Sequence, residues 1–220
     1  MPAAKSTSPL LELPVELRYD MYDLLCITEP KSYPFGFSPI TFIDRRPPSV
    51  ALQLTCKLIH HELEDLFYRQ ATLRMHIQSW QPHYKRDRDT WLKPIRLARK
   101  IEVVLNWRPC GLDPAENRSD LNDDLDGTTV AAERQSLAST VKLLNAEATK
   151  LEVLTITVRD LCSFEKGCAV GWISLDPLEN VSPHVRVVLG EADFDSGGFE
   201  DLYGGWKEYL GRMNARRMKT

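Results

Sequence analysis

The segment KLEVLTITV (residues 150–158) gives the clearest secondary-structure signal of the chain. Most of its residues are Val, Ile, Leu or Thr, which favour strands. Three other segments have a similar composition: LRMHI (73–77), KIEVVLNW (100–107) and HVRVVLG (184–190). Because continuous runs of this kind are typical of strands covered on both faces, as in parallel sheets, we predict an α/β or α+β fold.

Helical periodicity lies between the second and third of these strands. Val130, Leu137, Val141 and Leu144 recur on one side of a helix predicted at about 129–148. The strand segments also share a loose form, as in LARKIEVVL, ATKLEVLTITV and NVSPHVRVVL. Since their spacing is irregular, we predict a degenerate strand–helix repeat of leucine-rich-repeat type, or a small α/β layer, over 73–220.

Two further segments of that region differ in composition from the strands. An acidic loop is expected at 113–127, and a basic terminal helix, broken at Gly211, at 206–219.

The N-terminal third has a helical pattern instead. In LPVELRYDMYDLL (13–25) the large apolar residues recur at spacings of three and four: Leu13, Leu17, Met21, Leu24 and Leu25. Pro14 suits the first helical position, and Glu16 favours the positive end of the helix. A second helix is predicted at about 49–68 from Leu52, Cys56, Ile59, Leu63 and Leu66. We expect a loose tail at 1–9 and a proline-rich loop at 29–49.

Composition excludes several classes of protein. The chain of 220 residues has a net charge of −3 and 43% hydrophobic residues, so neither a general nucleic-acid binder nor a disordered chain is expected. No apolar run approaches the roughly 18 residues that span a bilayer, and MPAAKSTSP lacks the apolar core of a signal peptide. We therefore expect a cytoplasmic or nuclear protein without membrane association. The scattered cysteines are expected to be reduced.

Two parts of the N-terminal region together resemble the F-box-like domains of many fungal proteins. The first part matches a leucine-proline-x-glutamate-x-arginine helix at Leu13, Pro14, Glu16, Leu17, Arg18, Met21 and Tyr22. The second matches a threonine-cysteine-lysine helix that ends in leucine-phenylalanine-tyrosine, at Thr55, Cys56, Lys57, Glu62, Leu66, Phe67 and Tyr68. The resemblance covers roughly 10–77 and implies an F-box-like helical module at 10–72.

The resemblance implies a non-enzymatic adaptor that serves a ubiquitin ligase. Its first helix would dock on a Skp1-like adaptor through Leu13, Pro14, Glu16, Leu17, Met21 and Leu25. Residues 73–220 would then form a recognition domain that holds an unidentified protein target. Leu24 and Leu25 are expected to turn toward the second helix, which leaves Leu13, Pro14 and Leu17 to the partner.

An alternative function rests on WQPHYKRDRDTWLKPIRLARK (80–100). It contains seven Lys or Arg residues with aromatic residues among them, a combination that suits phosphate contacts and base stacking. The candidates for nucleic-acid or target binding are Lys85, Arg86, Arg88 and Trp91. A solvated connector with a partly buried apolar side is the structural alternative.

The segment NDDLDGTTVAAE (122–133) coincides weakly with a calcium-binding loop. Asn122, Asp124, Asp126 and Glu133 occupy ligand positions of that pattern. Asn stands where Asp is expected at the first position, and the alternative is an acidic loop with Thr129 as a helix N-cap. His60 and His61 lack the H-E-x-x-H spacing, and no nucleotide or nucleophile motif occurs. We therefore expect no metal, no cofactor and no catalytic residue.

Overall fold

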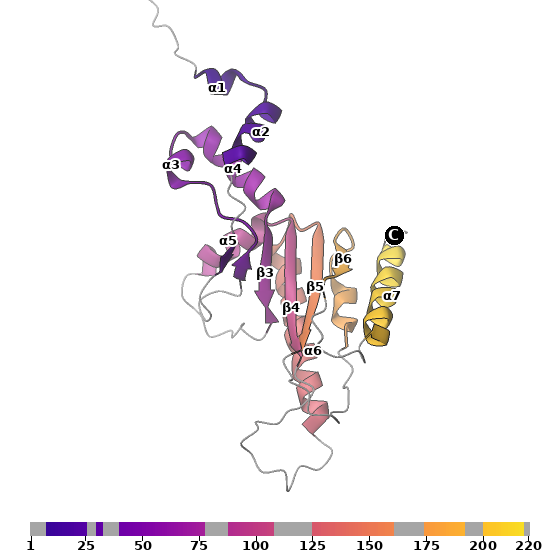
Figure 1. The fold of residues 1–220 in the computed structure, drawn as a ribbon. Helices are drawn as coiled ribbons and strands as arrows, with labels where there is room; N and C mark the ends of the chain where they lie inside the picture. Colours follow the sequence, from indigo (N-terminus) through magenta and orange to yellow (C-terminus); the bar gives the residue numbers. More distant parts are fainter. Residues whose placement is uncertain are drawn as a thin grey trace, which may run out of the picture.

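The computed structural model describes residues 8–25, 30–32, 40–77, 88–107, 125–160, 174–191 and 200–217. Within them the fold is mixed α+β, with helices grouped around a six-stranded sheet (Figure 1). The prediction of an α/β or α+β fold is therefore confirmed at this level.

The strands follow each other across the sheet in sequence order. They are β1 (Lys31–Ser32), β2 (Ile40–Ile43), β3 (Thr72–His76), β4 (Lys100–Trp107), β5 (Val153–Asp160) and β6 (Arg186–Leu189). β1, β2 and β3 pair antiparallel, whereas β3 to β6 pair parallel. Parallel neighbours need crossover connections, which contain α5 (Arg88–Leu97), α6 (Leu125–Glu147) and the short 3-10 helix η2 (Asp176–Asn180).

The segment predicted as a proline-rich loop at 29–49 contains two of these strands, so that prediction was wrong for β1 and β2. Ile40 and Ile43 of β2 pair with Met75 and Leu73 of β3 and are buried. Prolines exclude a long helix, but a short ITFI run between them is free to form a strand. The sheet therefore includes part of the segment that we assigned to the helical module.

The N-terminal helices are α1 (Pro9–Glu12), α2 (Val15–Leu25), α3 (Val50–Gln53) and α4 (Lys57–Gln70). The second helix was predicted as continuous over 49–68, but the structure has two helices there, α3 and α4, separated by a short non-helical segment. There the Thr55 hydroxyl donates to the Leu52 carbonyl at 2.7 Å, and Cys56 is extended at φ −160°. A side chain that bonds the preceding turn competes with helix propagation, which explains the break.

Two further boundaries differ from the prediction. α6 begins at Leu125, four residues before the predicted start, so Thr129 lies inside the helix and is not its N-cap. α7 (Glu200–Arg217) runs through Gly211 without interruption. Its apolar residues Trp206, Leu210 and Met213 are buried in the core, and this packing outweighs the cost of one glycine, about 1 kcal/mol.

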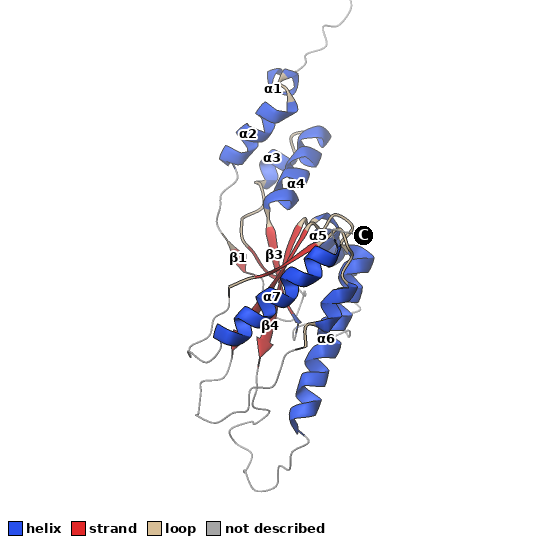
Figure 2. Cartoon of the chain, turned by 90° about the vertical axis from the view of Figure 1, so that its right-hand side faces the viewer, coloured by secondary structure: helices blue, strands red, loops and turns tan. Residues whose placement is uncertain are grey.

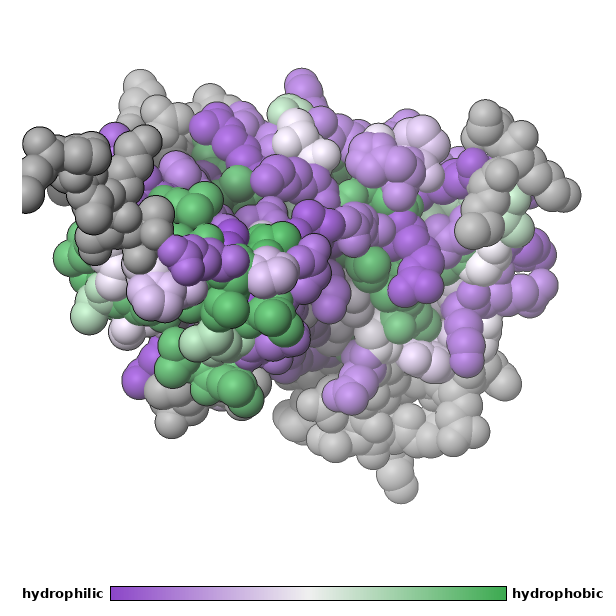
Figure 3. Space-filling view, turned by 90° about the horizontal axis from the view of Figure 1, so that it is seen from above, coloured by the Kyte–Doolittle hydropathy of each residue, from purple (hydrophilic) through white to green (hydrophobic). Residues whose placement is uncertain are grey.

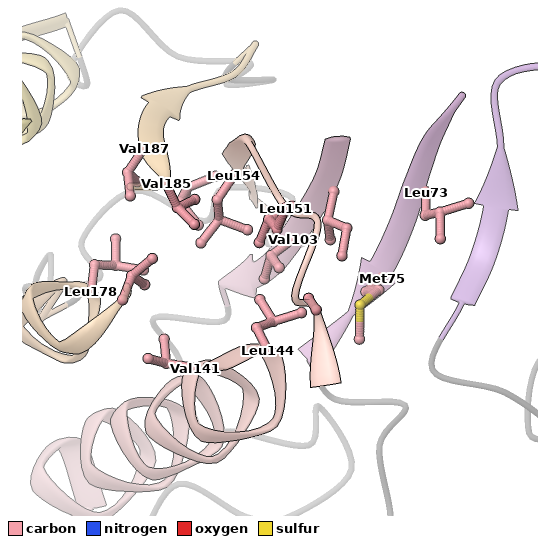
Figure 4. Packing of buried hydrophobic residues seen from close by; sticks show 14 of the residues in the cluster. Leu73, Met75, Val103, Val141, Leu144, Leu151, Leu154, Leu178, Val185 and Val187 are labelled. Carbon is pink, nitrogen blue, oxygen red and sulfur yellow. The ribbon is translucent and has the colours of Figure 1, made fainter. Parts of the chain in front are cut away.

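The main hydrophobic core lies between one face of the sheet and the helices α5, α6, α7 and η2. α6 lies behind the sheet in Figure 1 and beside it in Figure 2. Figure 4 shows Val141 and Leu144 of α6 pointing toward the strands that carry Val103 and Leu154. A second, smaller cluster joins α2 to α4, and consists of Tyr22, Ile59, Leu63 and Leu66.

α7 covers the outer edge of β6. The Asn214 side chain accepts from the Val187 N–H at 3.2 Å and donates to the Val187 carbonyl at 2.5 Å. The Tyr203 hydroxyl also donates to the Gly190 carbonyl at 3.1 Å. An amide that bonds both groups of an edge residue takes the place of a further strand. Of the helices that the structure describes, none is both long and apolar enough to cross a membrane.

Candidate docking site

Helix α2 buries a polar pair rather than its leucines. Arg18 and Tyr22, one turn apart, are its buried residues, and both contact Glu62 of α4. The Arg18 guanidinium donates to the two carboxylate oxygens of Glu62 at 2.9 and 2.5 Å, and the Tyr22 hydroxyl donates at 3.0 Å. Paired donation by a guanidinium fixes orientation as well as distance, so the contact sets how α2 lies on α4.

The same guanidinium also holds the connection between α1 and α2. Arg18 Nη1 donates to the backbone carbonyl of Leu13, with a longer contact of 3.5 Å to the carbonyl of Leu11. The carbonyls at the end of α1 lack helical partners, and Arg18 supplies them. One buried side chain therefore positions both short helices against α4.

The electrostatics of this network favour an ion pair beside a neutral phenol. The hydrogen bond from Arg18 lowers the pKa of Glu62 and outweighs the opposing effect of burial. The same hydrogen bond raises the pKa of Arg18. Burial, reinforced by the hydrogen bond to Glu62, raises the pKa of Tyr22 to about 12. At neutral pH the charges of Arg18 and Glu62 therefore compensate each other in the interior.

The large apolar residues of α2 remain on the surface. Leu17, Met21, Leu24 and Leu25, which we call the leucine face, are exposed, and Leu24 is 87% exposed. The other exposed large apolar residues that the structure describes also lie at this end of the chain: Leu11, Val50, Leu54 and Leu58. Figure 3 shows apolar residues gathered over the half of the molecule formed by α1 to α4. Exposed groups of this kind mark interaction surfaces.

The prediction that Leu24 and Leu25 turn toward the second helix was wrong. Arg18 and Tyr22 occupy that position because Glu62 lies opposite them on α4. Apolar periodicity alone does not find such a face. The signal in the sequence was the spacing of Arg18 and Tyr22 by one turn, together with a glutamate inside the second helix.

The other residues expected to contact a partner lie around the leucine face. Pro14 and Glu16 are exposed, and Leu13 is half-buried where α1 meets α2. Pro14 precedes the first helical residue, Val15, and its carbonyl accepts from the Arg18 N–H at 3.2 Å.

The residues predicted for nucleic-acid or target binding are only partly described. Lys85 and Arg86 lie outside the described residues, and Arg88 and Trp91 are described only as backbone positions of α5. Later in this helix Leu92 and Ile95 are buried in the main core. The apolar half of the stretch therefore has a structural role.

The weak calcium pattern falls mostly on a helix. Asn122 and Asp124 lie outside the described residues, whereas Asp126 and Glu133 are backbone positions of α6. A calcium loop of this type needs a turn around its sixth position, and α6 is already helical there. Within the described ranges no group of three or more His, Cys, Asp or Glu side chains is arranged to hold a metal ion.

Comparison with known proteins gives this chain no relative. No family model, no curated protein and no solved structure matches it.

Proposed function

We propose that this chain is a non-enzymatic adaptor that docks on a Skp1-like protein and recruits a protein target to a ubiquitin ligase, in the cytoplasm or the nucleus. The observation that carries the proposal is the leucine face, which α2 leaves exposed although it buries Arg18 and Tyr22. The choice of a Skp1-like protein as the partner rests on the resemblance of 10–77 to F-box-like domains.

The energetics of such docking are favourable. Burying a leucine or methionine side chain contributes roughly 1.5–3 kcal/mol before the cost of association. Leu17 and Met21 are about half exposed and Leu24 is almost fully exposed, so all three side chains can bury surface against a partner. A few such anchors carry most of the energy of a typical interface. Because Arg18 holds the helix in place, little ordering entropy is lost on docking.

The test compares two double variants of the same helix. Leu17→Ala with Met21→Ala removes the centre of the leucine face, whereas Asp20→Ala with Asp23→Ala changes exposed polar residues of α2. We expect co-purification with a Skp1-like protein to be lost in the first variant and retained in the second. Circular dichroism should be unchanged in both, because all four residues are exposed. Equal co-purification of the two variants would refute docking through this face.

A further inference from the structure

The second face of the sheet, opposite α6, carries an unusual set of side chains. None of the described helices covers this face, which is turned toward the viewer in Figure 1. Strand alternation places Leu73, Val103 and Ile156 in the core, and their neighbours along each strand point the other way. Among the described strand residues, the ionisable ones on this face are Arg74, His76, Lys100, Glu102, Arg159 and Arg186.

Positive charge exceeds negative charge on this face. Its one described carboxylate, Glu102, accepts from Arg74 Nε at 2.7 Å and from the Thr157 hydroxyl at 2.7 Å, so both of its oxygens are engaged. None of the described carboxylates forms an ion pair with Lys100, Arg159 or Arg186. Within the part of the chain that the structure describes, these three cations therefore have no compensating carboxylate, in a chain whose net charge is −3.

The register of the strands separates these cations into two groups. Lys100 of β4 and Arg186 of β6 flank Val153 of β5 in one row, at the start of the parallel strands. Arg159 lies six residues further along β5, opposite Asn106. At about 3.3 Å per residue the two groups are roughly 20 Å apart. An extended peptide spans that distance with about six residues.

The pKa of His76 reflects the electrostatic potential near Arg159. Its pKa is lowered first by burial and then by the positive charges of Arg159 and Arg74, which together outweigh the opposite effect of Glu102. His76 is thus a neutral group beside two guanidinium groups. The field at this end of the face favours an anion.

We propose that this basic sheet face (Arg74, His76, Lys100, Arg159 and Arg186) binds an extended acidic segment of the target protein, with carboxylates at Lys100 and Arg186 and again at Arg159. Charge complementarity supports this occupant. A nucleic acid fits less well, because the phenyl ring of Phe42 on this face lies under Arg74 at 4.8 Å and is not open to base stacking. The net negative charge of the chain also disfavours a long polyanion.

The inference deepens the proposed function, since the occupant would be the recruited target. The experiment uses the full chain without any adaptor, so its failure leaves docking by the leucine face to be judged on its own. The probe is a fluorescent peptide with two pairs of glutamates about six residues apart. A peptide with lysines in their place is the control, and single-stranded RNA is the competitor.

We expect the glutamate peptide to bind at low salt and the lysine peptide not to bind. Arg159→Glu and Arg186→Glu should each weaken binding about tenfold or more. Lys142→Glu is the matched control, because this exposed lysine lies on α6 and its charge change is the same. Equal weakening in all three variants, equal binding of both peptides, or tighter binding of the RNA would each overturn the proposal.

A second measurement uses the imidazole of His76. Bound carboxylates offset the charge of Arg159, so the glutamate peptide should raise the pKa of His76 in an NMR titration. In Arg159→Glu the pKa of His76 should rise without any peptide, which shows that the variant keeps the sheet and the neighbourhood of these groups. A peptide that binds but leaves the His76 titration unchanged would place the binding site elsewhere.

Discussion

At the scale of the residue, one buried salt bridge decides which side of α2 faces outward. Arg18 and Glu62 are 44 positions apart in the sequence, and their side chains are 10% and 9% exposed. A lone charge in such surroundings is costly, whereas a paired and hydrogen-bonded one is tolerated. The three donors that converge on Glu62 therefore explain how an arginine enters the interior while four large apolar residues stay outside.

Glu62→Gln should destabilise the protein, because it leaves the buried guanidinium of Arg18 without a counter-charge. We expect Tm to fall by at least about 4 °C. Asp23→Asn, an equivalent change on the exposed side of α2, should leave Tm within about 1 °C. Thermal unfolding followed by circular dichroism measures both variants. Equal Tm values would mean that the pair contributes nothing to stability.

Acid should remove the stabilisation that the ion pair between Arg18 and Glu62 contributes. The pKa of Glu62 in the folded state lies below its ordinary value of 4.5, so the unfolded chain takes up a proton first as the pH falls. The stabilisation is therefore complete above about pH 4.5 and is lost as the pH falls through the lower pKa of the folded state. Urea midpoints of the wild type should decline over this window more steeply than those of Glu62→Gln. Parallel profiles would contradict the pKa shift.

At the scale of the element, local composition predicts the strands whose own residues favour that structure. The run KIEVVLNW forms β4 with the predicted bounds, because its β-branched residues suit a strand that is buried on both faces, as Val103 and Val104 are. The short strand β2 and the outward leucine face depend on partners distant in the sequence. Periodicity within one segment contains no information about such partners. The side of α2 that faces outward, on which the docking proposal rests, was therefore not predictable from the periodicity of α2 alone.

Two glycines provide opposite tests of element packing. Gly211 lies in α7, where a Cβ would meet nothing within 4 Å, whereas a Cβ on Gly190 would collide with Oγ1 of Thr157. Gly211→Ala should stabilise the protein by about 0.5–1 kcal/mol through helix propensity. Gly190→Ala should destabilise it by about 1–3 kcal/mol through overpacking. Chemical denaturation measures both, and a change of the same sign in the two variants would disprove this account of α7 and the end of β6.

At the scale of the whole molecule, the two hydrophobic clusters share one helix. α4 contributes Ile59, Leu63 and Leu66 to the small cluster with α2, and Phe67 to the main core beneath the sheet. The leucine face is therefore attached through α4 to the domain that carries the basic sheet face. Partner and target would be held at a defined separation by packed structure. The smaller cluster, with few apolar groups, supplies the weaker part of this connection.

Unequal strength of the two clusters should appear in hydrogen exchange. Leu63 and Leu154 are both fully buried, the first in the small cluster and the second in the main core. Each change to Ala should cost about 2–5 kcal/mol where the packing is lost. Leu63→Ala should speed exchange of the amides of α2 and the first turns of α4 and leave β4 and β5 protected. Leu154→Ala should speed exchange throughout, because α4 rests on the main core. The same exchange pattern in both variants would instead establish a single cooperative unit, with α2 as stable as the sheet.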